Sequence, residues 1–258
     1  MNLFSPFRKD NSKIEYKVLA ITIAFENIQV IEKQIQQFIR GNAFDNSFKL
    51  VIVDNSRFSK SSRAIKNICN EYAVDYYRLK KNPYSGIDPS KSHGFALNWA
   101  VKNISSRYKS TWIGFLDHDI FLLSDIHKLF EKLVESKSAY GVQHRKEGKW
   151  YLWPGLIFLK RKEVNIGDLD FMPVAGLDTG GGNWRNVFSG LAENKLEKIK
   201  VDTIFPEGKD KQNKQKDAIQ VIDRIWLHLI NASNWAGVDM SHKQEKLDIL
   251  VETLIVKE

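Results

Sequence analysis

Two acidic residues flank a histidine in the most apolar part of the sequence. Asp117 and Asp119 follow an apolar run at 112–116 and precede another at 120–123. Carboxylate oxygens are preferred ligands of Mg²⁺ and Mn²⁺, and a bound cation offsets the negative charge that builds on a leaving diphosphate. The same Asp-x-Asp pattern also occurs in solvated turns. A solvated turn does not explain why two charged residues lie between two apolar runs, so we expect Asp117 and Asp119 to hold Mn²⁺ or Mg²⁺.

The elements around this motif alternate between strand and helix patterns. Apolar, β-branched runs predict strands at 18–25, 50–53, 74–79 and 111–116. Apolar residues at helical spacing predict helices at 28–39, 65–72, 95–100 and 126–134. The alternation predicts an α/β fold with a central, mostly parallel sheet and helices on both faces. Ligands bind outside the carboxyl ends of such strands, where Asp54 and Asp117 both fall.

The second half of the chain has a different pattern. Residues 150–159 predict a long strand with an irregularity at Pro154-Gly155, and residues 174–184 predict a Gly-rich loop. The apolar stretch at 219–230 fits a helix or a strand. We expect a polar loop at 205–217 and, after a capping box at Ser241, a terminal amphipathic helix. Without a repeat or a clear linker, residues 1–258 are interpreted as one domain.

Four short segments carry the remaining signal. They are Ile21–Glu26, Val51–Ser56, His93–Asn98 and Phe115–Asp119. In this order they resemble the first strand end, the second-strand signature, the helix before the metal motif and the Asp-x-Asp segment of GT-A glycosyltransferases of the family-two type. The resemblance covers about 17–126. It implies a GT-A (Rossmann-like) fold with a nucleotide-sugar donor half at about 15–126 and a mixed acceptor half at about 127–258.

The resemblance implies an enzyme that moves a sugar from a nucleotide-diphosphate sugar to an acceptor hydroxyl, with inversion. The residues expected to contact the donor are those of the matching segments: Ala24, Phe25, Glu26, Asp54, Asp117 and His118. Phe25-Glu26 stands where the family usually has Tyr-Asn. An inverting mechanism needs a carboxylate that accepts the proton of the acceptor hydroxyl. We assign that role to Asp178, with Asp168 and Asp170 as competing candidates and a tight turn as the alternative explanation for Asp178.

Several isolated residues fit such a site less specifically. Lys91 and His93 are candidates for contacting phosphate or uracil, and Trp184 for stacking against a sugar ring or base, as are Trp153 and Trp235. His228 resembles the late histidine that completes the metal shell in several GT-A enzymes. A histidine in a core, or an aromatic ring in a core, is the more common explanation for each of these residue types.

Bulk composition constrains the partners. The net charge of +8 and the pI of about 9.3 favour anionic ligands such as phosphorylated substrates, anionic lipid or nucleic acid. The densest basic run, at 209–216, has no interleaved aromatic residues, so we expect no nucleic-acid partner. The single cysteine, Cys69, excludes an internal disulfide. Without a signal-peptide or bilayer-spanning apolar run, we expect a cytoplasmic protein and leave open peripheral contact with the inner face of the membrane.

The expected partners follow from the resemblance, and rival functions stay open. A UDP-sugar is the preferred donor, and the acceptor is a glycan or a lipid-linked glycan. One rival is a sugar-phosphate nucleotidyltransferase, although residues 24–27 do not supply the Gly-rich basic loop that such enzymes place after the first strand. The other is a protein that binds a nucleotide sugar or glycan without turnover.

Overall fold

The computed structural model describes residues 14–44, 47–191, 196, 199–204, 218–230 and 232. The predicted loop at 205–217, the basic run within it, Trp235 and the predicted terminal helix lie outside these residues. The first half consists of β1 (Glu15–Ala24), α1 (Ile28–Arg40), β2 (Phe48–Asp54), α2 (Ser59–Glu71), β3 (Asp75–Arg78), α3 (Pro89–Asn103), β4 (Lys109–Asp117) and β5 (Ile120–Leu122). The second half consists of α4 (Ile126–Glu135), β6 (Ala139–Lys146), β7 (Lys149–Lys160), α5 (Asn183–Asn186), β8 (Val201–Ile204), β9 (Ile219–Ile222) and β10 (Trp226–Leu229).

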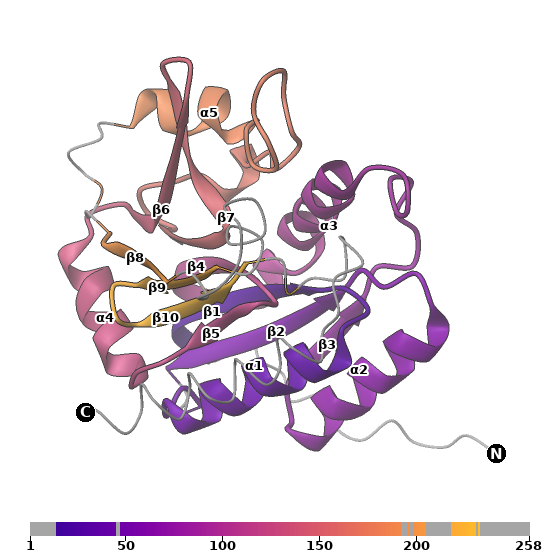
Figure 1. Cartoon of the computed structure of the whole chain (residues 1–258). Helices are drawn as coiled ribbons and strands as arrows, with labels where there is room; N and C mark the ends of the chain where they lie inside the picture. Colours follow the sequence, from indigo (N-terminus) through magenta and orange to yellow (C-terminus); the bar gives the residue numbers. More distant parts are fainter. Residues whose placement is uncertain are drawn as a thin grey trace.

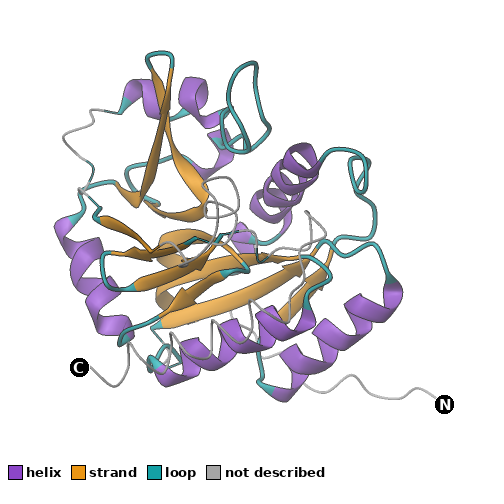
Figure 2. Cartoon of the chain, viewed as in Figure 1, coloured by secondary structure: helices purple, strands orange, loops and turns teal. Residues whose placement is uncertain are grey.

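The central sheet has the strand order β3-β2-β1-β4-β7-β6. β3, β2, β1 and β4 are parallel, whereas β7 runs antiparallel to β4 and β6 antiparallel to β7. The helices cover both faces: α1 and α2 lie along one face and α3 lies on the other (Figures 1 and 2). The predicted α/β fold with a mostly parallel central sheet is therefore confirmed.

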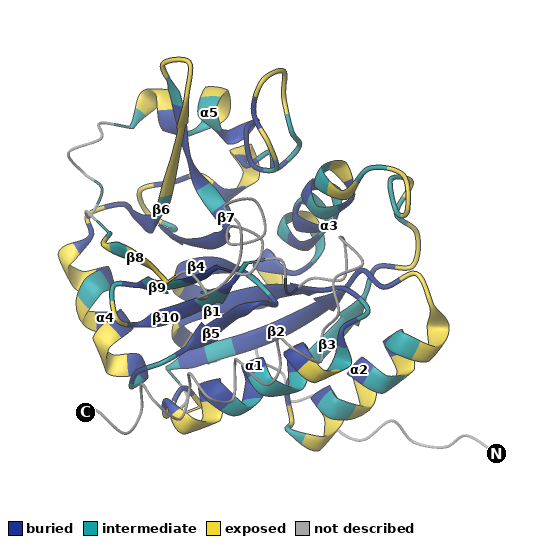
Figure 3. Cartoon of the chain, viewed as in Figure 1, coloured by how far each residue is buried: buried dark blue, intermediate teal, exposed yellow. Residues whose placement is uncertain are grey.

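Two apolar layers hold the helices to this sheet. One contains the inward faces of α1, α2 and α4, and the other contains the inward face of α3 and the segment at 164–188. Alternate residues of each strand supply the two layers, and the strands are buried along most of their length (Figure 3). Each helix buries the residues along one of its sides. The helical spacing of apolar residues therefore predicted all four helices.

A smaller, antiparallel sheet lies beside the motif at 117–119. Its strand order is β5-β10-β9-β8, and its first strand begins directly after Asp119. The apolar stretch at 219–230, which the sequence left between helix and strand, is two strands joined by a tight turn. No helix within the described ranges is long and apolar enough to cross a membrane.

Candidate active site

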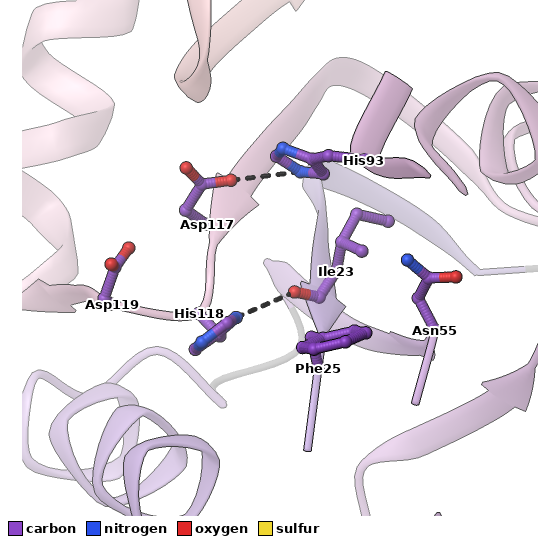
Figure 4. Close-up of a pocket in the computed structure, with 7 residues that line it drawn as sticks. All are labelled: Ile23, Phe25, Asn55, His93, Asp117, His118 and Asp119. Atoms are coloured by element: carbon purple, nitrogen blue, oxygen red, sulfur yellow. Dashed lines mark hydrogen bonds and ion pairs between the residues drawn. The ribbon is translucent and has the colours of Figure 1, made fainter. Parts of the chain in front are cut away.

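A pocket opens where the carboxyl ends of β1 and β4 lie side by side. The strand order changes direction at this point, since β1 continues to β2 on one side and β4 lies on the other. In open α/β sheets such a switch point forms a natural crevice for ligands. Counted with the solvent-open space at its mouth, the pocket holds about 340 Å³. Its lining comes from β1, the turn after β2, α3 and the acidic motif: Ile23, Phe25, Asn55, His93, Asp117, His118 and Asp119 (Figure 4).

The turn at 117–119 is fixed from below by one buried glutamine. Gln34 of α1 is completely buried, and its Nε2 donates hydrogen bonds to the carbonyl oxygens of Asp117 (2.9 Å) and Ile120 (2.7 Å). The two bonds clamp the backbone on both sides of the motif. His118 contributes a third tie, because its Nδ1 lies 3.1 Å from the carbonyl oxygen of Ile23 on β1. Gln34 was missed from the sequence, although a polar residue inside an apolar helical stripe was a signal for it.

Asp117 lies in an environment that disfavours its charge. Burial raises the pKa of Asp117 to about 6 and lowers the pKa of His93 to about 4. The His93 Nε2 lies 3.1 Å from the Asp117 Oδ1, but that buried oxygen accepts no well-aligned hydrogen bond from the residues that the structure describes. A buried carboxylate oxygen without a full partner is what a site for a cation would leave behind.

His228 reaches the motif through the second sheet. β10 pairs with β5 so that His228 lies opposite Ile120, and the backbone N–H of Leu229 donates to the carbonyl oxygen of Asp119 (3.1 Å). The His228 Nε2 then lies 4.0 Å from the Asp119 Oδ1. Burial raises the pKa of Asp119 and lowers that of His228. The structure thus brings a histidine from more than 100 residues away to the second acid of the motif.

These donors fit a divalent cation as a partial set of ligands. In the described part of the chain, no three His, Cys, Asp or Glu side chains converge closely enough to enclose a metal ion. Asp117 and Asp119 would supply oxygen donors and His228 a nitrogen donor to such a cation, and the phosphate oxygens of a ligand would complete the shell. Carboxylates serve both Mg²⁺ and Mn²⁺, whereas an imidazole nitrogen suits Mn²⁺ better.

A glycine on β7 makes room for the motif. A Cβ at Gly155 would lie 2.6 Å from the Asp117 Oδ2 and 2.1 Å from the nearest ring atom of Trp153. Only a residue without a side chain fits between them. The irregularity expected at Pro154-Gly155 therefore serves the site, since it lets β7 approach the carboxylate of Asp117.

Asp178 is fastened to the first turn of α3. Its Oδ1 accepts hydrogen bonds from the hydroxyl of Ser90 and from the backbone N–H of Thr179 (2.7 Å). The hydroxyls of Ser90 and Thr179 are 2.7 Å apart, which ties the loop to the helix. The negative charge of Asp178 raises the pKa values of His93 and Asp117, although less than burial changes them, but Asp178 is exposed and does not line the pocket.

The competing acids have other surroundings. The Asp170 Oδ1 accepts hydrogen bonds from Asn98 (2.8 Å) and the backbone N–H of Met172 (3.0 Å), so this carboxylate anchors the loop on α3. Asp168 is exposed in a short 3₁₀ turn. Gly180, with a φ of 87°, adopts a conformation that favours glycine, so it serves the shape of the loop that carries Asp178.

The expected nucleotide end of the site is arranged differently from the sequence prediction. Phe25 lines the pocket, and Ala24 is buried at the end of β1 directly before it. Asp54, by contrast, is completely buried: its Oδ1 accepts from the backbone N–H of Ser56 (2.8 Å) and its Oδ2 from the hydroxyl of Tyr76 (2.7 Å). The structure therefore places Asp54 behind the pocket.

Asn55 takes the place on the pocket wall that was expected for Asp54. The Asn82 Nδ2 donates to its Oδ1 (2.8 Å), and the Asn55 Nδ2 donates to the hydroxyl of Ser92 (3.2 Å). Sequence reasoning missed Asn55, although it lies within a segment that carried the resemblance. Successive residues of an extended chain point to opposite sides, so only one of Asp54 and Asn55 can face the pocket.

Three other expected contacts are absent from the pocket wall. The carboxylate of Glu26 is held by Arg57 through two hydrogen bonds of 3.0 and 3.1 Å. The Lys91 Nζ pairs with Asp88 at 3.2 Å on the exposed first turn of α3. Trp184 packs in the apolar layer beside α3, with its ring centroid 6.1 Å from that of Trp150.

Trp153 of β7 lies beside the acidic motif. Its ring centroid lies 4.7 Å from that of His228, and its ring borders Gly155 beside the Asp117 carboxylate. Its indole is half-buried. Of the described tryptophans considered for a sugar contact, the structure brings Trp153, and not Trp184, to the acidic motif.

No protein-family model matches the sequence, and no curated protein sequence matches it either. Among solved structures, the chain is similar to TarS from S. aureus, with 16% identity over 55% of this chain and 28% of that chain and a TM-score of 0.39. It is also similar to the mannosyltransferase PcManGT from Pyrobaculum calidifontis in complex with GDP-Man and Mn²⁺ (12% identity, 74% of this chain, 59% of that chain, TM-score 0.46). A third is glucosyl-3-phosphoglycerate synthase from Mycobacterium tuberculosis (15% identity, 70% of this chain, 68% of that chain, TM-score 0.48). The chain spans less than two thirds of the length of the first two.

Proposed function

We propose that this chain is a metal-dependent glycosyltransferase of the GT-A type, which moves a sugar from a nucleoside-diphosphate sugar to an acceptor hydroxyl. The observation that carries the proposal is the position of two acids, the half-buried Asp117 and the buried Asp119, at the β1/β4 switch point with the Nε2 of His228 4.0 Å from Asp119. Two neighbouring acids and an imidazole make a poor anion site by themselves. With Mn²⁺ bound, they become a site for a diphosphate.

The donor would lie along the carboxyl edge of the sheet. Phe25 and Asn55 offer an aromatic ring and an amide to the nucleoside, and Asp117, Asp119 and His228 hold the cation that binds the diphosphate. The cation supplies positive charge to the oxygens of the leaving group. His118, tied through its Nδ1 to β1, keeps the two acids on the same edge.

The acceptor hydroxyl would be activated by Asp178. In the proposed step its carboxylate takes the hydroxyl proton while the acceptor oxygen forms a bond to the anomeric carbon. The bond from that carbon to the diphosphate oxygen breaks, and its electron pair leaves with the diphosphate. Attack on the face opposite the leaving group inverts the configuration. Ser90 and Thr179 both bond to the Oδ1, which leaves the Oδ2 for the proton.

The two halves of the chain divide these tasks in the proposal. Residues at about 15–126 bind the donor, and residues at about 127–258 supply Asp178, Trp153 and His228. We propose a UDP-sugar as the donor, Mn²⁺ in preference to Mg²⁺, and a glycan or lipid-linked glycan as the acceptor. A cytoplasmic location with peripheral contact at the membrane face would fit the net charge of +8 and a lipid-linked acceptor.

A donor screen tests the proposal. Released nucleoside diphosphate is measured for UDP- and GDP-sugars with Mn²⁺ and with EDTA. Wild-type protein should release diphosphate only with the metal, and Asp119→Asn should lower the rate at least about 100-fold because the cation loses a ligand. Asp202→Asn, a change to an exposed acid on β8, is the matched control and should keep the wild-type rate. An Asp119→Asn variant with the full metal-dependent rate would end the assignment.

A further inference from the structure

His228 has one hydrogen-bonding partner built into the second sheet. Gln220 on β9 lies directly opposite His228 on β10 in the antiparallel register. The His228 Nδ1 lies 2.9 Å from the Oε1 of Gln220. An amide oxygen accepts hydrogen bonds and cannot donate them, so the hydrogen of this contact belongs to the imidazole. In a neutral imidazole with its hydrogen on Nδ1, the Nε2 carries a lone pair.

That lone pair is directed toward the acidic motif. The His228 Nε2 faces the Asp119 Oδ1 at 4.0 Å, a separation too long for a hydrogen bond. Two electron-pair donors therefore face each other with no hydrogen between them. A divalent cation held by Asp119 and His228 would accept both electron pairs and so offset their repulsion.

The surroundings of His228 restrict the orientation and the tautomer of its imidazole ring. The Trp153 ring packs against the imidazole at a centroid distance of 4.7 Å, and the imidazole is only 12% exposed. If the ring took the other tautomer, its Nδ1 and the amide oxygen of Gln220 would both be acceptors, and the Nε2 hydrogen would point at the place of the cation.

We propose that Gln220 is a positioning residue, which fixes the tautomer and orientation of His228 and thereby raises the affinity of the site for Mn²⁺. This inference rests on the proposed metal-dependent function. Metal-bound histidines commonly donate their second ring N–H to such a partner, and loss of the partner costs about 10–100-fold in metal affinity. Gln220 is such a partner for His228, which the pairing of β10 with β5 brings to the site.

The test compares two substitutions that differ in one property. Gln220→Leu removes the acceptor, whereas Gln220→Glu keeps an acceptor oxygen at the same position. Thr203→Val is the matched control, because Thr203 pairs with Gln220 from β8 and is exposed. The dissociation constants of Mn²⁺ and Mg²⁺ are measured on the full chain by titration calorimetry, in the presence and absence of UDP, and thermal unfolding is recorded in EDTA.

We expect Gln220→Leu to weaken Mn²⁺ binding about 10–100-fold and Mg²⁺ binding by less, since Mg²⁺ depends less on nitrogen ligands. Gln220→Glu should bind Mn²⁺ at least as tightly as the wild type, and Thr203→Val should match it. Equal Mn²⁺ affinity of the wild type and Gln220→Leu, equal losses in the Leu and Glu variants, or equal losses for both metals would overturn the role of Gln220. A wild-type protein that binds no Mn²⁺ even with UDP would instead contradict the proposed function itself.

Discussion

We predict that the negative charge of Asp117 lowers the free energy of unfolding of the metal-free protein. Its pKa rises from an ordinary value of 3.8 to about 6 because the group is buried. The folded state thus binds this proton more tightly than the unfolded chain does. As the pH rises from about 4 through 6, the folded state loses that advantage, and above about pH 7 the full cost of a buried charge remains.

The size of the cost follows from the same rise. A change from 3.8 to about 6 corresponds to about 3 kcal/mol, since each pKa unit is worth about 1.4 kcal/mol. The side chain is 22% exposed, so water screens part of it, and we expect about 1–3 kcal/mol. Asp117→Asn keeps the shape and removes the charge. At pH 8 in EDTA, the Asn variant should therefore be more stable than the wild type by that amount.

Urea unfolding at pH 8 and pH 5, with and without Mn²⁺, checks this prediction. The gain in the free energy of unfolding from Asp117→Asn should fall to about half at pH 5, where the carboxyl is protonated in the folded state but still ionised in the unfolded chain, and it should vanish only below about pH 4. At a concentration 100 times its dissociation constant, Mn²⁺ should stabilise the wild type by about 2.7 kcal/mol and the variant far less. An Asn variant that is no more stable than the wild type at pH 8, or a gain that does not change with pH, would refute the reasoning.

Three further perturbations probe the supports of the site. Gly155→Ala should weaken Mn²⁺ binding at least about 10-fold and cost about 1–3 kcal/mol of stability, because its Cβ overlaps Trp153 and the Asp117 carboxylate; unchanged calorimetric affinity would contradict this. Gln34→Leu removes the side-chain donor of the Asp117 and Ile120 carbonyl oxygens and should lower the free energy of unfolding by about 2–4 kcal/mol in a urea titration; a loss below about 0.5 kcal/mol would speak against the clamp. Burial raises the pKa of the Cys69 thiol to about 12, so Ellman's reagent at pH 8 should label it only after unfolding, and rapid labelling of the native protein would show that the thiol is accessible.

The parallel half of the fold could be predicted because its signals are local. The ends of β1, around Ile21, and of β4, before Asp117, are apolar runs. The helices between the strands show periodic apolar stripes. The spacing of apolar residues also assigned two exposed residues to those stripes: Ile39 is 44% exposed and Val134 is 86% exposed. Val134 follows Leu133, and neighbouring residues on a helix are about 100° apart, so the core receives only one of them.

The second sheet could not be predicted because its pairing is not local. β5 has three residues, and its partner β10 lies more than 100 residues further along the chain. The turn that joins β9 to β10 places Asp223 and Arg224 at φ values of 52° and 58°, without the Asn-Gly or Asp-Gly signature of such turns. The stretch at 219–230 was therefore ambiguous in sequence, and the contact of His228 with Asp119 depended on it.

The candidate site was predicted in its acidic centre and less well at its edges. Asp117, Asp119, His93, His118 and Phe25 all line one pocket. The partners that remove other residues from the pocket come from elements far away in sequence, as when the hydroxyl of a tyrosine on β3 binds the carboxylate at the end of β2. Such partners depend on how strands align, which composition and spacing do not determine.

The most direct measurement is the affinity of the wild-type protein for UDP and UMP, with Mn²⁺ and with EDTA. If Asp117 and Asp119 hold a cation that binds the diphosphate, Mn²⁺ should tighten UDP binding at least about 10-fold and UMP binding much less, because UMP lacks the second phosphate. Asp119→Asn should remove the effect of the metal on UDP. Equal UDP affinity in Mn²⁺ and in EDTA, or an equal gain for UMP, would contradict the account of this motif as a metal–diphosphate site.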